Sequence, residues 1–328
     1  MPGGAARRGS QPIRRHHDSG AQPRRRADIL NEHGQCAGAV LYNMETQEYF
    51  AVEAKAVVMA TGGCGRLHIQ GFMTTNHHGA TGDGIVMGYR AGAPVVFLHT
   101  VQYHPTGIVF PEQAEGILIT EKLRGSGANL VNFDGEQLVN EREPRDVEAA
   151  SIIKECVVEN KGVPTPTGKL GIRLDSPMIE MLADEGTVQK ESPGKYILYK
   201  RFGIDISKEP MLIYPTLHYQ NGSLELQADG RTCLPGLFIA GKVGGGIHGA
   251  NRLMGSSLLD IVVYGRISGA SSAEYIAGEH TDGALHLDHA RSYSSEIDGR
   301  VAPALIPDYT DPELWERQLT TSYVGNVR

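Results

Sequence analysis

A glycine-rich stretch between Ile239 and Asp260, IAGKVGGGIHGANRLMGSSLLD, places an arginine between bare backbone and the start of an apolar helix. Glycines let backbone approach a large flat ligand, and a helix N-terminus attracts partial negative charge. Arg252, held between glycine-rich segments, is suited to clamp an anion through charge-assisted hydrogen bonds. We therefore expect this stretch to line a site for a flat ligand and an anion.

The same stretch also fits the spacing G-x-G-x-x-G of dinucleotide-binding loops, through Gly244, Gly246 and Gly249. Such a loop lies directly between a strand and a helix, and an acidic residue about 20 positions further on holds the ribose. Here the apolar helix begins only seven residues after Gly249, and no acidic residue lies near position 269. The spacing therefore does not indicate a Rossmann dinucleotide loop.

The composition of the whole chain is typical of an α/β enzyme. Its 328 residues suffice for two domains or for one domain with an insertion, and 41 glycines favour tight turns. The formal net charge of −7 gives no global indication of a nucleic-acid partner. No apolar run approaches the ~20 residues that a bilayer span needs, so no transmembrane segment is predicted.

Two further features bear on metals and on the N-terminus. The four cysteines lack the short spacings of zinc or iron–sulfur ligands, so we expect no metal site and four buried, reduced thiols. Residues 1–27 carry seven arginines and two histidines without apolar periodicity, which predicts a disordered basic tail. An organellar transit peptide or a nucleic-acid-binding arm are the alternatives for this tail.

Hydrophobic periodicity predicts the elements that must position these residues. A β-hairpin is expected to feed a buried strand at Ala56–Ala60, which ends at a Thr-Gly-Gly turn. A short helix is expected at Gly84–Arg90, and strand-like sequence follows over Val95–Gly107. A second buried strand in GLFIAG precedes a long helix that begins after Ser256 or Ser257.

The middle of the chain is predicted to be mixed. We expect a hairpin with its turn at Asp134-Gly135 and a helix in PRDVEAASIIKECVVEN whose N-cap is Asp146. A further helix is expected at Ser176–Asp184, and MLIYPTLHYQNGSLEL returns to a strand pattern.

With these elements in place, HGANRLMGSSLLD closely resembles the signature of the fumarate reductase / succinate dehydrogenase flavoprotein family, which also includes L-aspartate oxidase. The resemblance spans roughly Ile29–Gly278. Six further segments match the family in the same order: ATGGCGR, TGDGIVMGYRAGA, QYHPTG, ITEKLRGSGANLVN, RDVEAASI and LHYQNG.

The resemblance implies an α/β fold: a partial, Rossmann-like FAD-binding domain with an inserted α+β capping domain that closes over a dicarboxylate. The expected boundaries are 28–107 and 218–278 for the FAD-binding domain, 108–217 for the capping domain and 279–328 for a truncated helical region. The family's N-terminal strand, glycine loop and helix, which hold the FAD pyrophosphate, are not recognised in this sequence. We therefore expect the chain by itself not to hold stoichiometric FAD.

For chemistry, the resemblance implies that hydride passes between flavin N5 and one olefinic carbon of fumarate while a proton goes to the other. Arg145 matches the family's proton donor, and Glu121 and Arg124 match its relay to solvent. Because the pKa of arginine is above ~12, Arg145 can serve only if it is reprotonated as it gives its proton away.

Four positions match the family's substrate-binding residues: His104, Thr120, His218 and Arg252. Fumarate carries two carboxylates, so a site that excludes water needs several cationic or donor groups. Each charge-assisted hydrogen bond contributes about 1.5–3 kcal/mol, so three or four can offset the desolvation of a dianion.

The resemblance also implies a set of cofactor-binding positions. At Lys242 the family usually has a glutamate that contacts the ribityl arm of the flavin, so a cation stands where an acceptor is expected. The matching positions are Thr61, Gly62, Gly63, Asp83, Gly241, Lys242, Asn251, Ser256, Ser257 and Leu258.

The implied protein is an FAD-dependent oxidoreductase that interconverts fumarate and succinate. Its implied partners are the dicarboxylate and an iron–sulfur subunit or another electron-transfer partner. The implied location is cytoplasmic, or peripheral to the inner membrane through partner subunits. An L-aspartate oxidase-like flavoenzyme and an inactive, truncated remnant of the family are the alternatives.

Overall fold

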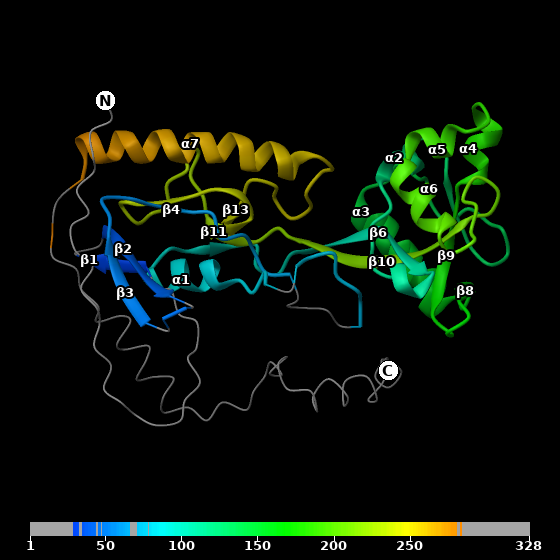
Figure 1. The fold of residues 1–328 in the computed structure, drawn as a ribbon, viewed down its shortest axis with the longest axis horizontal. Coiled ribbons are helices and arrows are strands. Elements are labelled where there is room, and N and C mark those ends of the chain that lie inside the picture. The colour runs from blue at the N-terminus through cyan, green and yellow to red at the C-terminus, as the bar shows by residue number, and fades with distance from the viewer. Residues whose placement is uncertain are drawn as a thin grey trace, which may run out of the picture.

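The computed structural model describes residues 29–32, 35–43, 45–46, 48–65, 71–77, 79–280 and 283. They form an elongated molecule in two parts, joined by two long strands, β6 (Val101–Phe110) and β10 (Met211–Gln220) (Figure 1). The basic tail expected at 1–27, and all but three residues of the region expected at 279–328, lie outside the described residues.

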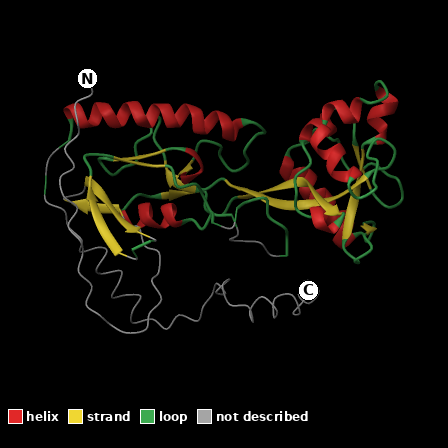
Figure 2. Ribbon diagram, in the orientation of Figure 1, coloured by secondary structure: helices red, strands yellow, loops and turns green. Residues whose placement is uncertain are grey.

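The first part contains small sheets between two helices (Figure 2). One sheet is antiparallel, in the order β1-β2-β3, and a parallel pair joins β4 to β12. A third sheet has the order β13-β11-β5. The elements are β1 (Ile29–Glu32), β2 (Gln35–Asn43), β3 (Glu48–Glu53), β4 (Val57–Met59), α1 (Asp83–Ala91), β5 (Val95–Val96), β11 (Ser223–Glu225), β12 (Leu237–Ile239), a 3-10 turn (Gly241–Val243), β13 (Gly244–Gly245) and α7 (Ser256–Gly278).

The second part is a sheet of order β6-β10-β9-β7, with β8 paired to β9, covered by helices on one side (Figure 1). Its core is a cluster of fully buried aliphatic side chains that includes Ile119, Leu130 and Ile172. The elements are a 3-10 turn (Glu112–Ala114), α2 (Glu121–Gly125), β7 (Asn129–Val131), α3 (Arg145–Ile153), a π-helical turn (Lys154–Val158), β8 (Val163–Pro164), β9 (Leu170–Asp175), α4 (Pro177–Leu182), α5 (Thr187–Glu191) and α6 (Pro193–Lys200).

The strands β6 and β10 carry the connection between the parts. They pair antiparallel along most of their length, so they act as one two-stranded ribbon that enters both parts. The domain boundaries expected at 107/108 and 217/218 fall inside β6 and β10 respectively. Side chains on this ribbon therefore lie where the two parts meet.

Most of the predicted elements are present, with two corrections. The expected strand over Val95–Gly107 is interrupted, because Phe97 adopts a φ of 54° and Thr100 bonds back to its carbonyl, which closes a turn between β5 and β6. The prediction that Asp146 caps α3 is wrong. The helix begins at Arg145 after Pro144, and Asp146 lies inside the first turn.

The surface and the cysteines give three further findings. Cys36, Cys64 and Cys156 are buried free thiols, but Cys233 is exposed, so the expectation of four buried thiols is wrong for Cys233. Within the described ranges, no helix is long and apolar enough to cross a bilayer. The same ranges contain no group of three His, Cys, Asp or Glu side chains able to hold a metal ion.

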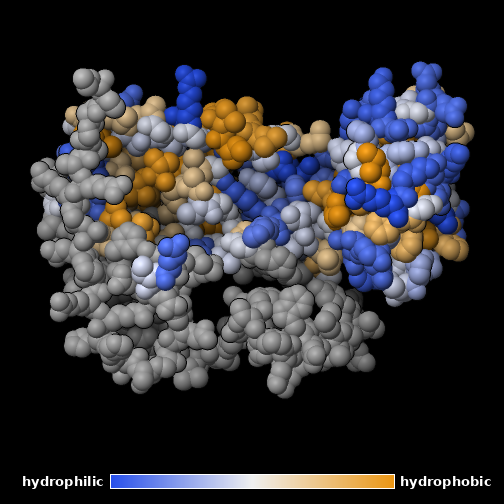
Figure 3. Space-filling model, viewed as in Figure 1, coloured by the Kyte–Doolittle hydropathy of each residue, from blue (hydrophilic) through white to orange (hydrophobic). Residues whose placement is uncertain are grey.

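The long helix α7 has two different faces. Asp260, Ser268 and Tyr275 are buried against the body of the first part. Leu258, Leu259 and Val262 are exposed, and Figure 3 shows apolar side chains gathered over this helix. The buried face fixes the start of α7 beside the ends of β4 and β12.

Candidate active site

The β6–β10 ribbon brings two histidines together. His104 on β6 and His218 on β10 have ring centroids 5.3 Å apart in an edge-to-face arrangement. His218 Nε2 lies 3.1 Å from Arg252 Nη2, and its Nδ1 lies 2.9 Å from Thr75 Oγ1. Because a guanidinium can only donate, Nε2 of His218 must accept, and the proton of the neutral ring sits on Nδ1.

Both histidines are held neutral. Burial, followed by the charges of Arg145 and Arg252, lowers the pKa of His218 to about 3. Burial is also the main cause that lowers the pKa of His104 well below its ordinary value, again assisted by Arg145. These rings can therefore act as neutral hydrogen-bonding groups at pH 7.

A chain of alternating arginines and glutamates lies beside the histidines. Arg145 Nε donates to Glu121 Oε1, and Arg145 Nη1 donates to Gln102 Oε1 at 2.9 Å. On the next turn of α2, Arg124 Nη2 reaches the same Glu121 oxygen at 3.2 Å. His104 Nε2 is 3.8 Å from that oxygen as well. One carboxylate oxygen thus connects the two arginines and faces the histidine.

The chain continues to a residue that sequence reasoning missed. Arg124 Nη1 donates to Glu148, a fully buried carboxylate on α3. Glu148 Oε2 has no hydrogen-bond partner within the described residues. Burial lowers the pKa of Arg124 to about 10, with Glu121 acting in the opposite direction. The position of Glu148 three residues after Arg145, on one face of a predicted helix, was the available signal.

Gln102 is the second residue that sequence reasoning missed. Its amide accepts from Arg145 and donates both to Asn251 Oδ1 at 2.6 Å and to the Arg252 carbonyl at 2.7 Å. Asn251 also donates to Asp146 at 2.7 Å. Gln102 therefore fixes the glycine-rich loop to α3, and it sets the position of Arg252 relative to Arg145.

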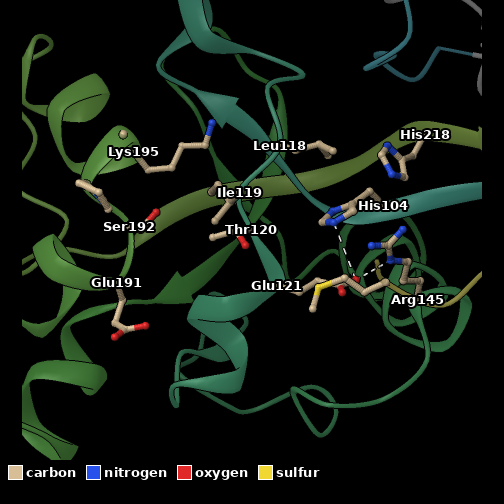
Figure 4. A pocket seen from close by; sticks show the side chains of 13 residues that line it. His104, Leu118, Ile119, Thr120, Glu121, Arg145, Glu191, Ser192, Lys195 and His218 are labelled. Carbon is tan, nitrogen blue, oxygen red and sulfur yellow. Dashed lines mark hydrogen bonds and ion pairs between the residues drawn. The ribbon is translucent and has the colours of Figure 1, made fainter. Parts of the chain in front are cut away.

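The two histidines and the Arg145–Glu121 pair border a pocket of about 590 Å³ (Figure 4). His104, His218, Glu121 and Arg145 line one side of it, and Thr120 lines it next to Glu121. Arg252 is buried beside His218, and its guanidinium carbon lies 4.7 Å from the centre of the Tyr219 ring. The structure thus brings together all seven residues predicted to bind substrate or to move a proton.

The charge balance of this region favours an anion. Among the residues that line the pocket, Arg145 and Lys195 are balanced by Glu121 and Glu191, and the buried Arg252 beside His218 adds a cation that has no carboxylate partner within the described residues. Burial is the main cause that lowers the pKa of Arg252, and the charge of Arg145 adds to it. A dianion in the pocket would relieve this excess of positive charge.

The predicted cofactor residues gather at a second place. Since β4 and β12 are parallel, their carboxyl ends lie together, which places Gly63 beside Lys242 and Gly241 beside the start of α7. This is where ligands bind in open parallel sheets. Thr61, Gly62, Ser256, Ser257 and Leu258 belong to the same ends of these elements.

The backbone there fits a large flat group with acceptor atoms. Gly62 and Gly249 have φ values of 73° and 58°, and no atom lies within 4 Å of the place where a Cβ would be. The N-cap of α7, Gly255, offers no side-chain acceptor; the N–H groups of Ser256 and Leu258 bond the carbonyls of Leu253 and Gly255, which leaves the N–H of Ser257 for a ligand acceptor. The residues present therefore fit the flavin end of FAD.

Three of the predicted cofactor residues have partners within the protein. Lys242 Nζ donates to Asn76 Oδ1 at 2.9 Å and lies 4.9 Å from the centre of the Tyr219 ring. Burial is the main cause that lowers the pKa of Lys242. Asp83 accepts from the Thr81 hydroxyl at the start of α1, and Asn251 is bonded as described above.

The fold and the site are those of an FAD-binding flavoprotein, and comparison with known proteins identifies the family. The profile of the FAD binding domain family matches residues 7–258. A polypeptide of the fumarate reductase (CoM/CoB) of Methanothermobacter marburgensis is 35% identical over 296 residues, which are 88% of this chain and 52% of the relative. The succinate dehydrogenase flavoprotein subunit of Coxiella burnetii is 36% identical over 84% of this chain and 46% of its own length.

Solved structures lead to the same family. An E. coli quinol fumarate reductase superposes with a TM-score of 0.68 at 31% identity, over 83% of this chain and 47% of that one. An adenylylsulfate reductase from Archaeoglobus fulgidus, at 16% identity and a TM-score of 0.52, shares the fold alone. The chain belongs to the fumarate reductase and succinate dehydrogenase flavoprotein family. It spans about half the length of the curated relatives it matches.

Proposed function

We propose that this site binds fumarate or succinate and supports their interconversion. The observation that carries the proposal is the continuous chain from Arg145 through Glu121 and Arg124 to Glu148, which opens on a pocket beside the histidines and the unpaired cation of Arg252. When bound, FAD supplies or accepts the hydride. The protein's own residues bind the dicarboxylate, exclude water and move the proton.

The substrate-binding residues keep donors available for two carboxylates. Arg252 is 3% exposed, and its Nε has no hydrogen-bond partner within the described residues. Thr120 accepts from Lys122 N at 3.3 Å as the cap of α2, which leaves its hydroxyl proton free to donate. His104 and His218 stand ready as neutral hydrogen-bonding groups, and the charge of an entering anion would oppose the arginine charges that add to burial in lowering their pKa values.

Arg145 is placed to act as the proton donor. Its Nε and Nη1 are bonded to Glu121 and Gln102, so Nη2 is the nitrogen left to face the pocket. As Nη2 gives its proton to the substrate carbon, Arg145 becomes neutral; Arg124 then passes a proton to the Glu121 carboxylate, Glu121 passes it on to Arg145, and Arg124 is reprotonated from solvent. This order avoids a long-lived neutral arginine at pH 7.

The acidic groups argue against an amino acid as the substrate. L-aspartate would bring an ammonium into the pocket, and the two carboxylates that line it are already engaged. Glu121 is held by Arg145 and Arg124, and Glu191 is paired with Lys122. We therefore propose fumarate, rather than L-aspartate, as the substrate.

The electron-transfer partner follows from the same proposal. One structural neighbour is a quinol–fumarate reductase with menaquinol molecules, and another is a Mycobacterium smegmatis Sdh1 in complex with UQ1. We infer that this chain exchanges electrons with an iron–sulfur subunit or a similar partner. It would then be cytoplasmic, or peripheral to the inner membrane through that partner.

Calorimetric titration with succinate and L-aspartate, in saturating FAD, tests the proposal together with dye-coupled fumarate reduction. Succinate should bind, L-aspartate should not, and fumarate should be reduced. Arg142→Gln is the matched control for substitutions of Arg145, and it should leave both measurements unchanged. Arg142 lies in the same segment, and its guanidinium donates to the exposed Gly125 carbonyl. Tight L-aspartate binding, or no dicarboxylate binding at all, would reject the proposal.

A further inference from the structure

A threonine that lies in none of the motifs named above stands behind His218. The segment 73–75 runs beside β10, because Thr75 N donates to the Leu217 carbonyl at 3.0 Å and Leu217 N donates to the Met73 carbonyl at 2.7 Å. These backbone bonds place the Thr75 side chain next to the following residue of β10, His218. Thr75 Oγ1 lies 2.9 Å from His218 Nδ1 as a result.

The hydrogen bonds of Thr75 have a defined direction. A hydroxyl has one proton to donate, and that of Thr75 goes to the Leu217 carbonyl at 3.4 Å. The hydroxyl oxygen is therefore the acceptor in the contact with His218, and Nδ1 must carry the ring proton. At the other end of the ring, Nε2 accepts from Arg252 Nη2 at 3.1 Å, because a guanidinium can only donate. Both ends of the His218 ring require the same tautomer.

The opposite tautomer would remove the support of Arg252. With the proton on Nε2, two N–H groups would face each other between His218 and Arg252. Arg252 Nη1 donates to the Leu253 carbonyl at 2.8 Å, and Nε has no partner among the described residues. In that part of the chain, no side chain other than His218 accepts from this guanidinium. Thr75 thus keeps the ring in the form that orients Arg252.

His104 is held in the other form. The backbone N–H of Thr106 donates to His104 Nδ1 at 3.3 Å, so Nδ1 is an acceptor. The proton of the neutral ring then lies on Nε2, 3.8 Å from Glu121 Oε1. Both histidines border the pocket (Figure 4), but they present different groups. His104 offers a donor, whereas His218 offers an acceptor that Arg252 occupies.

We propose that Thr75 is a positioning residue of this site, which fixes the tautomer of His218 and thereby holds Arg252 in place for an anion. The hydrogen bonds run from Arg252 to His218 to Thr75 and end at a backbone carbonyl. A guanidinium cannot accept and a carbonyl cannot donate, so this order cannot be reversed. The step from tautomer to substrate binding rests on the proposed function, because it takes Arg252 as the group that clamps a carboxylate.

The first measurement is the tautomer of His218, which needs no substrate. Ring nitrogen chemical shifts are recorded by NMR on the full chain with isotope-labelled histidine, and His218→Gln assigns the signal. In the wild-type protein, His218 should be protonated at Nδ1 and His104 at Nε2. Thr75→Val keeps the shape of the side chain but removes the acceptor. A share of His218 protonated at Nε2 should then appear, while His104 stays unchanged.

The second measurement is succinate affinity, by calorimetry in saturating FAD. Thr75→Val should weaken binding about two- to tenfold, as expected for one hydrogen bond between neutral groups. Fumarate turnover at saturation should change less than affinity, because Arg145 is not part of this hydrogen-bonded chain. Thr75→Ser keeps the hydroxyl and should restore both the tautomer and the affinity.

Thr74→Val is the matched control. It removes a hydroxyl from the same segment, one that donates to the Gly65 carbonyl at 2.8 Å, and it should leave the tautomer of His218 unchanged. The inference is overturned if wild-type His218 carries its proton on Nε2, if Thr75→Val leaves the tautomer as it was, or if succinate affinity does not fall with the tautomer. A wild-type protein that shows the expected tautomers but binds no dicarboxylate would instead reject the proposed function.

Discussion

Arg145→Gln removes the guanidinium that faces the pocket and keeps a polar side chain at the start of α3. In the wild-type protein, this guanidinium bonds Glu121 through Nε and Gln102 through Nη1. After the substitution, Glu121 still has Arg124 at 3.2 Å, so its carboxylate is not left alone. The side-chain oxygen of Gln102, Oε1, loses its donor, and we expect the free energy of unfolding to fall by about 1–3 kcal/mol.

The effect on turnover should be much larger than the effect on binding. Loss of a positioned general acid lowers the rate by about 10²–10⁴, or about 2.7–5.5 kcal/mol of barrier. Arg252, His104 and His218 remain to hold the carboxylates, so the dissociation constant for succinate should change far less. If Arg145 is only an anchor, the split is reversed, and the apparent KM rises while kcat is spared.

The assay combines steady-state fumarate reduction with an equilibrium measurement. Succinate affinity is measured by calorimetry, and the two histidines are followed by NMR. Because the charge of Arg145 helps to lower the pKa values of His104 and His218, both should rise in Arg145→Gln. A merely structural defect would not move both pKa values upward while succinate still binds. Unchanged turnover with a correctly folded variant would refute the assignment of Arg145 as proton donor.

Three other predictions follow from the same geometry. Arg252→Gln should weaken succinate binding about ten- to a hundredfold, and a calorimetric constant equal to wild type would contradict its role as an anion clamp. The folded-state pKa of His218 is about 3, below its ordinary 6.5, so the unfolded chain binds more protons than the folded chain between these two pH values. The free energy of unfolding should therefore fall as the pH drops from 6.5 to 3. In urea titrations, His218→Gln should make this fall smaller. Lys242→Glu restores an acceptor near the cation of Arg252 and should tighten FAD binding about fivefold or more in fluorescence titrations. Lys242→Met should not tighten it. Equal or weaker FAD affinity in Lys242→Glu would count against a ribityl contact at this position.

Local sequence was sufficient for the elements and for the family. The strand β4, the helices α1 and α4 and the start of α7 at Ser256 agree with the predictions, because apolar periodicity and glycine positions are encoded within short segments. The errors were local as well. A lone turn at Phe97 split one strand, and Pro144 displaced Asp146 from the cap of α3. Neither feature alters the hydrophobic pattern from which the elements were predicted.

The sequence by itself determined the family, since the matching motifs occur in family order, and it named the residues that the structure brings together beside one pocket. Only the tertiary structure decided which of them touch. Arg124 meets Glu148 across 24 residues of chain, and Gln102 meets Asn251 across 149. Ser192 and Lys195 belong to no motif, and they line the same pocket as His104 and His218 only because β6 and β10 join the two parts. Side-chain contacts at such separations depend on how the elements pack, and packing is a property of the whole fold, which no short segment of sequence contains.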